Sequence, residues 1–119
     1  MIDVIIDGLE LGRNCLIVED PITKNIAGDQ IGRSLTEAGY SVGETIVERA
    51  DMACVEKVRE LLKAFDFSIA VGGGTPIDVA KMATHQNQIE FISVPTALSH
   101  DGIASPIASI AHNRTKISL

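Results

Sequence analysis

The stretch SIAVGGGTPIDVAK, residues 68–81, places three structural signals in succession. Its first four residues form a short, nearly apolar run that is typical of a buried β-strand, and three glycines follow at once. Thr75 has the side chain of a helix N-cap, and Pro76 and Asp78 suit the first helical turn. We therefore predict a strand, a glycine turn and a helix from Thr75 to about Thr84.

The same strand pattern recurs on both sides of this stretch. Further short apolar runs cover Cys15–Val18, Val42–Val47 and Phe91–Val94. Since helix-like segments separate the runs, the connections should be right-handed crossovers and the strands should be parallel. The sequence predicts one α/β domain, a three-layer Rossmann-like fold with a mainly parallel sheet and helices on both faces.

Two helix-like segments connect the first three strands. The first runs from Pro21 to about Ala38, with Gly28 as a possible break and Gly39 as a C-terminal stop. Its apolar stripe consists of Ile22, Ile26, Ile31, Leu35 and Ala38. The second begins after Asp51, which can act as its N-cap. Its apolar stripe consists of Val55, Val58, Leu62 and Phe65.

Composition argues against several classes of partner. The 119 residues are 45% hydrophobic and only 3% aromatic, with a net charge of −6, which is unfavourable for binding nucleic acid or an acidic membrane surface. No apolar run approaches the roughly 20 residues of a membrane span, and the first residues carry no export signal. We expect Cys15 and Cys54 to be buried free thiols in a cytoplasmic protein.

The glycine turn is a candidate phosphate site. Glycines at the carboxyl end of a parallel strand let the backbone approach a phosphate, and the next helix offers free N–H groups. The turn is not a P-loop, which needs Gly-Lys-Ser/Thr, nor a Rossmann fingerprint, because Ile77 replaces the third glycine. A capped βα turn without a ligand is the alternative. Asp20 is either the N-cap of the helix at Pro21 or an acceptor for a ribose hydroxyl.

Three segments resemble the N-terminal half of the archaeal sn-glycerol-1-phosphate dehydrogenases. They are LIVEDPITKNIAGDQIG (residues 16–32), GGGTPIDVAK (72–81) and FISVPTALSHDGIASPIASI (91–110). This family is a branch of the superfamily of iron-containing alcohol dehydrogenases, glycerol dehydrogenases and dehydroquinate synthases. The string SHDGIASP is its most specific part, since the wider superfamily keeps only Ser-x-Asp there. Thr75-Pro76 departs from the pattern, because relatives often carry Lys and an aliphatic residue.

The resemblance implies a dehydroquinate synthase-like N-terminal domain that binds NAD or NADP. The enzyme would reduce dihydroxyacetone phosphate to sn-glycerol 1-phosphate, a precursor of archaeal membrane lipids. The residues expected along the cofactor pyrophosphate are Gly73, Gly74, Thr75, Pro76, Ile77 and Asp78. Those expected on the nicotinamide side are Thr96, Ala97, Leu98, Ser99 and Ser105. Asp20 would meet the adenosine ribose, and Asp101 would contact the substrate.

The resemblance also implies a zinc ion whose ligands are not in this chain. A helical C-terminal domain would supply an Asp and two His beyond Leu119, so residues 1–119 would be the NAD(P)-binding domain alone and inactive by itself. His85, His100 and His112 have no recognisable metal-site spacing, and we expect His100 to be a structural, hydrogen-bonded residue. Both ends of the sequence favour a fragment of a longer chain.

Two other functions stay open at this point: a glycerol or polyol dehydrogenase of the same superfamily, and a non-catalytic nucleotide-binding module. The choice between NAD and NADP is not settled either, although Asp20 at the ribose would repel a 2′-phosphate and favour NAD. An isolated domain should expose the face that packs on its partner, which favours a homo-oligomer.

Overall fold

The computed structural model of the chain describes residues 12–98, 104–106, 109–111 and 116–118. Four parallel strands form its centre: β1 (Asn14–Glu19), β2 (Ser41–Ile46), β3 (Phe67–Gly72) and β4 (Glu90–Leu98). The order across the sheet is β2-β1-β3-β4. This order requires crossovers over the sheet faces, as predicted for an α/β fold.

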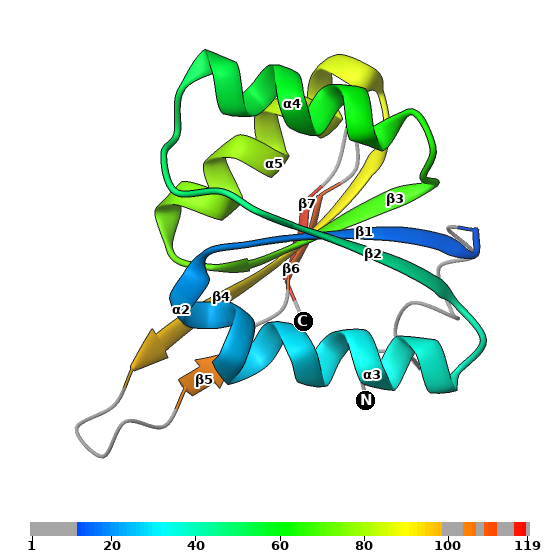
Figure 1. Ribbon diagram of the computed structural model, residues 1–119, viewed down its shortest axis with the longest axis vertical. Helices are drawn as coiled ribbons and strands as arrows, with labels where there is room; N and C mark the ends of the chain where they lie inside the picture. Colours follow the sequence, from blue (N-terminus) through cyan, green and yellow to red (C-terminus); the bar gives the residue numbers. More distant parts are fainter. Residues whose placement is uncertain (1–11, 99–103, 107–108, 112–115, 119) are drawn as a thin grey trace.

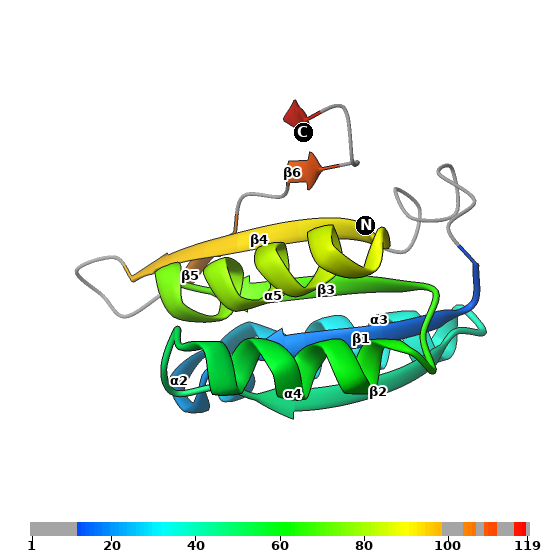
Figure 2. The same ribbon diagram turned by 90° about the horizontal axis from the view of Figure 1, so that it is seen from above.

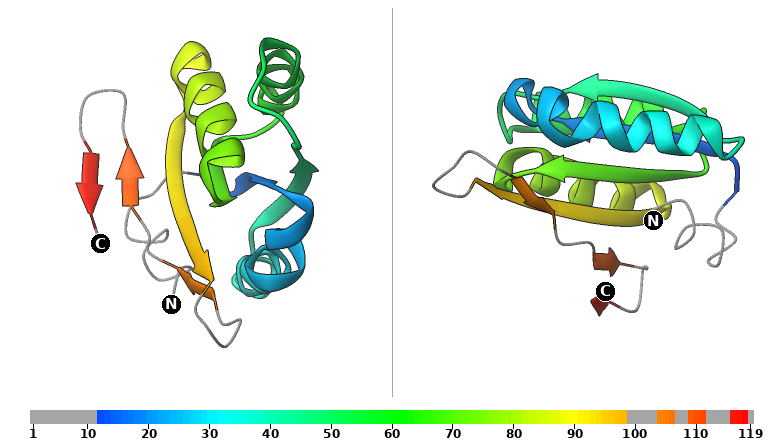
Figure 3. Two further views of the ribbon diagram at one scale, coloured as in Figure 1. Left: turned by 90° about the vertical axis from the view of Figure 1, so that its left-hand side faces the viewer. Right: turned by 90° about the horizontal axis from the view of Figure 1, so that it is seen from below.

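Three short antiparallel strands extend the sheet beyond β4: β5 (Ala104–Pro106), β6 (Ser109–Ala111) and β7 (Lys116–Ser118). β6 pairs with the first half of β4 and β7 pairs with β6, whereas β5 pairs with the last residues of β4. Figure 2 shows β6 outside β4, and the left view of Figure 3 shows β5 beside the end of β4. These three short strands were not predicted from the sequence.

Helices cover both faces of the sheet, which gives the predicted three layers (Figure 1). On one face α2 (Pro21–Thr23), a π-helical segment η1 (Lys24–Gly28) and α3 (Asp29–Glu37) follow one another without interruption. On the other face lie α4 (Met52–Leu62) and α5 (Gly74–Asn87). The fold class is therefore confirmed.

The core lies in two clusters because successive residues of a strand face opposite sides of the sheet. The cluster on the α3 side consists of Cys15, Ile17, Leu35, Tyr40, Phe67, Ile69, Val71, Ile92 and Val94. The cluster on the α4 and α5 side consists of Leu16, Val18, Val47, Val55, Val58, Leu62, Ala70, Val79, Ala80, Ala83 and Phe91. The central strands are apolar on both faces, as a covered parallel sheet requires.

Several local predictions are confirmed by the helix ends and the thiols. Asp51 Oδ1 accepts a 2.9 Å hydrogen bond from the Cys54 backbone N–H and caps α4. Gly39 has φ +96°, a left-handed conformation that suits a residue just after a helix. Cys15 is a fully buried free thiol, and burial raises its pKa well above the ordinary range. Cys54 is a free thiol as predicted, but its predicted burial was wrong, since it is half-buried.

Other local predictions were wrong. Ile22 does not belong to the buried stripe, since it is 66% exposed. Gly28 does not break the helix but ends η1, whose hydrogen bonds span one residue more than in an α-helix. β4 does not stop at Val94; its ladder continues through Pro95 to Leu98, because β5 pairs with its last residues.

Replacing Ile69 with alanine should test the two-sided core. Its side chain is completely buried in the central strand β3, so truncation leaves a cavity that the packed sheet cannot close. We expect the free energy of unfolding to fall by about 3 kcal/mol in urea titrations. Ile22→Ala is the matched control, and its effect should stay within about 0.5 kcal/mol because that side chain is exposed. Equal losses in both variants would contradict this placement of the core.

Candidate functional site

The carboxyl ends of the parallel strands meet at one edge of the sheet. Val71 is opposite Glu19 in β1 and opposite Val94 in β4, and Gly72 is opposite Pro95. The segments that follow these strands are thereby brought together. We call them the carboxyl-edge site: Asp20, the turn Gly72–Thr75, and Thr96–Leu98. Open α/β sheets bind ligands at this edge.

Asp20 is the N-cap of α2, as one of its two sequence interpretations expected. Its Oδ1 accepts hydrogen bonds from the backbone N–H groups of Ile22, at 2.9 Å, and Thr23, at 2.7 Å. In return the Asp20 N–H donates to Thr23 Oγ1 at 3.3 Å, which completes a capping box. These bonds use Oδ1, so the cap leaves Oδ2 as a possible ligand acceptor.

The glycine turn packs directly on this cap. The Thr23 hydroxyl donates a 3.1 Å hydrogen bond to the Val71 carbonyl, which ties α2 to the end of β3. Gly72 has φ +137°, and a Cβ there would lie 2.9 Å from Asp20 Oδ2 and 2.8 Å from Pro76 Cγ. Only glycine fits this position, because both the backbone conformation and the space exclude a side chain.

The first turn of α5 is left without a side-chain cap. Gly73 is the N-cap and α5 begins at Gly74, so the prediction that Thr75 caps this helix was wrong. By contrast, carboxylates cap α2 and α4, and the hydrogen bond from Cys54 lowers the pKa of Asp51. A Cβ at Gly73 would have no neighbour within 4 Å. Among the described residues no side chain caps this turn, so its open space and the N–H groups of a helix start favour an anion.

Glu19 is a carboxyl group inside the protein, at the last residue of β1. Its side chain is 0% exposed, and neither oxygen has a hydrogen-bond partner among the described residues. It lies against η1, where a Cβ at Gly28 would collide with its carboxylate. Burial, and then the negative charge of Glu44, raises the pKa of Glu19 to about 7, whereas Lys24 acts in the opposite direction.

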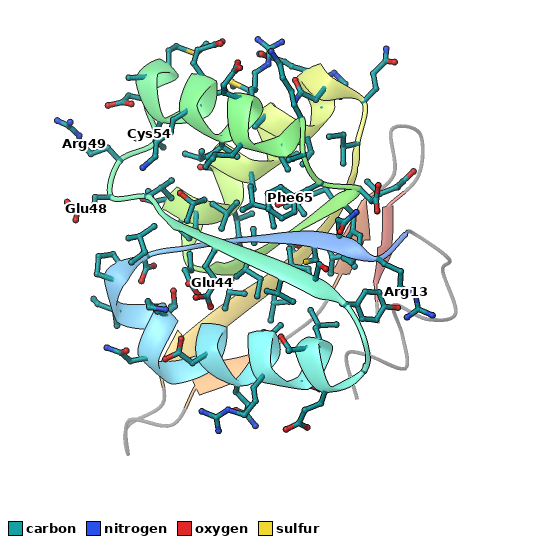
Figure 4. All side chains as sticks on the ribbon, turned by 45° about the vertical axis from the view of Figure 1, so that its right-hand side comes forward. Arg13, Glu44, Glu48, Arg49, Cys54 and Phe65 are labelled. Carbon is teal, nitrogen blue, oxygen red and sulfur yellow. The ribbon has the colours of Figure 1, made fainter. Side chains whose placement is uncertain are left out.

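Lys24 of η1 is the cation that reaches Glu19, with Nζ 3.8 Å from Oε1. It is closer to two other carboxylates, at 3.0 Å from Asp29 Oδ1 and 3.1 Å from Glu44 Oε2. These hydrogen bonds raise the pKa of Lys24 above its ordinary range. Figure 4 shows Glu44 pointing from β2 toward this helix, whereas Glu48 and Arg49 point outward. We call Glu19, Lys24, Asp29 and Glu44 the Lys24 cluster.

The structure describes only some of the residues that we predicted on the nicotinamide side. The backbone of Thr96, Ala97 and Leu98 forms the end of β4, where Ala97 is directly opposite Ser105 of β5. This ladder brings together four of the five residues expected there. The fifth, Ser99, and the predicted substrate contact Asp101 lie outside the described residues.

Ile77 and Asp78 belong to α5, and Asp78 stays close to the glycine turn, since a Cβ at Gly74 would lie 3.9 Å from Asp78 Oδ2. Ile77 is half-buried against the core, and Asp78 is exposed. Asp78 borders a groove of about 780 Å³ between the start of α4 and α5. Asp78 is the fifth residue of α5, past the first four N–H groups that a helix leaves free, and its carboxylate would repel a phosphate.

No metal centre is visible in the described part of the chain. It contains no group of three or more His, Cys, Asp or Glu residues that could hold a metal ion. His85 is exposed on α5, and His100 and His112 lie outside the described residues. The described residues therefore do not fit a zinc ion. They also include no helix that is long and apolar enough to cross a membrane.

Sequence reasoning missed Thr23, Glu19 and Lys24 as members of this region. A signal for Glu19 was present, because Cys15, Ile17 and Glu19 alternate along one strand and must share a face. Nothing in the sequence indicated the contacts of Lys24, because they join η1 to β1, α3 and β2 through tertiary structure.

Comparisons with known proteins identify the family of the chain. A sequence model of the iron-containing alcohol dehydrogenase family matches residues 4–119. Glycerol-1-phosphate dehydrogenase, NAD(P)+, from Methanothrix thermoacetophila is 41% identical over 110 residues, which cover 91% of this chain and 31% of that protein. The protein of the same name from Methanothermobacter thermautotrophicus is 45% identical over 104 residues, 87% of this chain and 30% of that protein. The chain thus spans about a third of the length of these relatives.

Solved structures share the fold at lower identity. Alcohol dehydrogenase from Oenococcus oeni is 21% identical with a TM-score of 0.72, over 98% of this chain and 37% of that one. Glycerol dehydrogenase from Schizosaccharomyces pombe is 21% identical with a TM-score of 0.68, over 89% of this chain and 30% of that one. The resemblance stated from the sequence is confirmed at the level of the family and the fold.

Replacing Glu19 with glutamine should remove a pH dependence of stability. Because the folded-state pKa is raised from 4.5 to about 7, between these values the folded protein holds a proton that the unfolded chain has released. The free energy of unfolding of the wild type should therefore fall as pH rises through this window, by up to about 3 kcal/mol. Urea unfolding across the window would show this fall, and Glu19→Gln should lack it.

Glu48→Gln is the matched control, since Glu48 is an exposed carboxylate after β2. It should keep the wild-type pH dependence. If Glu19→Gln and the wild type lose stability equally with rising pH, Glu19 does not hold the proton that its burial implies.

Proposed function

The chain belongs to the iron-containing alcohol dehydrogenase family, and we propose on that basis that its carboxyl-edge site binds NAD or NADP in an oxidoreductase. The observation that carries this function is the uncapped start of α5, with open space at Gly73, beside the capped start of α2. The finer reaction is the reduction of dihydroxyacetone phosphate to sn-glycerol 1-phosphate. It is supported by relatives named glycerol-1-phosphate dehydrogenase and by the string SHDGIASP.

The dinucleotide fits the geometry of the turn. Its pyrophosphate would lie over Gly73, where an added Cβ would meet nothing within 4 Å, and Gly74, where Asp78 Oδ2 is 3.9 Å from such a Cβ. The N–H groups of the first turn of α5 can donate to it. Thr75–Asp78 would line that turn, with donors from Thr75, since Pro76 has no N–H and the Asp78 carboxylate would repel a phosphate. The adenosine ribose would lie toward Asp20, whose Oδ2 faces Gly72 and is not used by the cap.

The bound nicotinamide supplies the hydride, and this chain would position it. Thr96, Ala97, Leu98, Ser99 and Ser105 would line the ring at the end of β4. Asp101 would accept a hydrogen bond from a substrate hydroxyl and so fix which face of the carbonyl meets the ring. Thr75-Pro76 lacks the Lys that relatives often carry, so phosphate binding would rest on backbone donors.

Residues 1–119 would act as the dinucleotide-binding domain of a cytoplasmic enzyme with a second, helical domain that holds zinc. That domain would supply the zinc ligands, since the described residues contain no group that could bind the ion. The chain alone should therefore bind the dinucleotide weakly and should not turn over.

A polyol dehydrogenase is the second candidate, since the structural neighbours include glycerol dehydrogenases. Activity of the full-length protein on dihydroxyacetone and on its phosphate distinguishes the two enzymes. A clear preference for the phosphate is expected. Equal or better activity on dihydroxyacetone would favour the polyol enzyme, and an open reading frame that stops at Leu119 would favour a non-catalytic module.

Replacing Gly73 with alanine should weaken dinucleotide binding without unfolding the protein. The added Cβ meets nothing within 4 Å in the protein, yet it occupies the space where the pyrophosphate would approach the helix. We expect roughly a tenfold loss of affinity for NAD+, since removing donor contacts of this kind costs on the order of 1.4 kcal/mol. An NMR titration of the labelled protein measures affinities in this weak range.

Met52→Ala is the control for this variant, because Met52 is exposed at the first turn of α4, whose N-terminus Asp51 caps. Its affinity for NAD+ should match that of the wild type. If Gly73→Ala binds NAD+ as well as the wild type does, the pyrophosphate does not lie at the start of α5.

A further inference from the structure

The Lys24 cluster lies next to the residue that we assign to the adenosine ribose. Glu19 precedes Asp20 directly, and η1 continues the helix that Asp20 caps. The ribose 2′ position is the one place where NAD and NADP differ, since NADP carries a phosphate there. On the basis of the proposed function, we infer that Glu19 is a specificity-determining residue whose proton sets the preference between NAD and NADP.

Among the charged groups around Glu19, the proton on Glu19 itself is what changes the local charge. Lys24 of η1, Asp29 of α3 and Glu44 of β2 face it, and Asp20 lies at the start of α2. The β3 residue opposite Glu19 is Val71, which brings no charge. Lys24 is held closer to Asp29 and Glu44 than to Glu19. Its positive charge is therefore largely neutralised by Asp29 and Glu44 and not by Glu19.

Protonation of Glu19 therefore changes the net charge of the Lys24 cluster by one unit, although Glu19 itself would not contact the ligand. An ionised Glu19 gives the Lys24 cluster three carboxylates against one ammonium, and a protonated one leaves two. A 2′-phosphate carries nearly two negative charges above a pKa of about 6. NADP should thus bind less well as Glu19 ionises, whereas NAD, which lacks that phosphate, should be affected little.

The test compares the affinities for NAD+ and NADP+ as a function of pH. NMR titrations of the isotope-labelled chain give both dissociation constants, and the carbon shift of the Glu19 carboxyl reports its protonation in the same sample. In the wild type, the ratio of the Kd for NADP+ to the Kd for NAD+ should rise roughly five- to tenfold from about pH 6 to about pH 8.5. The rise should follow the titration of Glu19.

Three variants separate Glu19 from the titration of the phosphate itself. Glu19→Gln should keep the low-pH ratio at every pH, apart from the change that the phosphate causes near its own pKa of about 6. Glu48→Gln should behave as the wild type. Glu44→Gln should move the midpoint to lower pH, because the charge of Glu44 raises the pKa of Glu19. A merely structural role for Glu19 would not predict that movement.

The outcomes are distinct. The specificity role is overturned if the ratio of the two dissociation constants has the same pH dependence in the wild type and in Glu19→Gln. It is also overturned if the ratio in the wild type does not change with pH. Either result leaves the proposed dinucleotide site intact. Failure of the chain to bind either NAD+ or NADP+ overturns the proposed function and the specificity role together.

Discussion

The hydrogen bond from the Thr23 hydroxyl to the Val71 carbonyl, 3.1 Å long, joins the two βα units that build the carboxyl edge. Thr23 belongs to the capping box that begins one helix, and Val71 precedes the glycine turn that begins another. The two segments are also held by their paired strands and by the packing of Gly72 on Asp20 and Thr23. Through these contacts, the capped start of α2 and the open start of α5 become one surface, to which a single ligand can bind across both.

The absence of a side chain at Gly72 is what allows that surface to close. Side-chain atoms of Pro76, Asp20 and Thr23 lie 2.8–2.9 Å from where its Cβ would be, so the two helix starts could not pack this closely around a side chain. Their electrostatic character nevertheless differs. Asp20 supplies negative charge to the N-terminus of α2, whereas no side chain does so for α5. An anion at this edge would therefore bind at α5, and hydroxyl donors would bind at Asp20.

The sequence predicted what depends on periodicity and failed where tertiary contacts decide. Alternating apolar runs identified the four parallel strands, and Asp51 and Gly39 marked helix ends correctly, because caps act within a few residues. Thr75 did not cap α5, since the helix extends back to the glycines. β4 extends beyond the apolar run that predicted it, because β5 pairs with its last residues. β5 is too short to be recognised from the sequence. The role of Glu19 depends on η1, which no periodicity indicates.

The burial of Glu19 is a cost that the fold could have avoided with an apolar residue. Cys15 and Ile17, on the same face of β1, are buried without penalty, and a third such residue would extend the same core cluster. A carboxyl group instead lies against the glycine of a π-helical segment, with its one cation shared by two other acids. Buried ionisable groups that reduce stability concentrate at functional sites. Glu19 comes one residue before Asp20, the acid proposed to meet the ribose, so the proposed selection of the dinucleotide would give this cost a functional explanation.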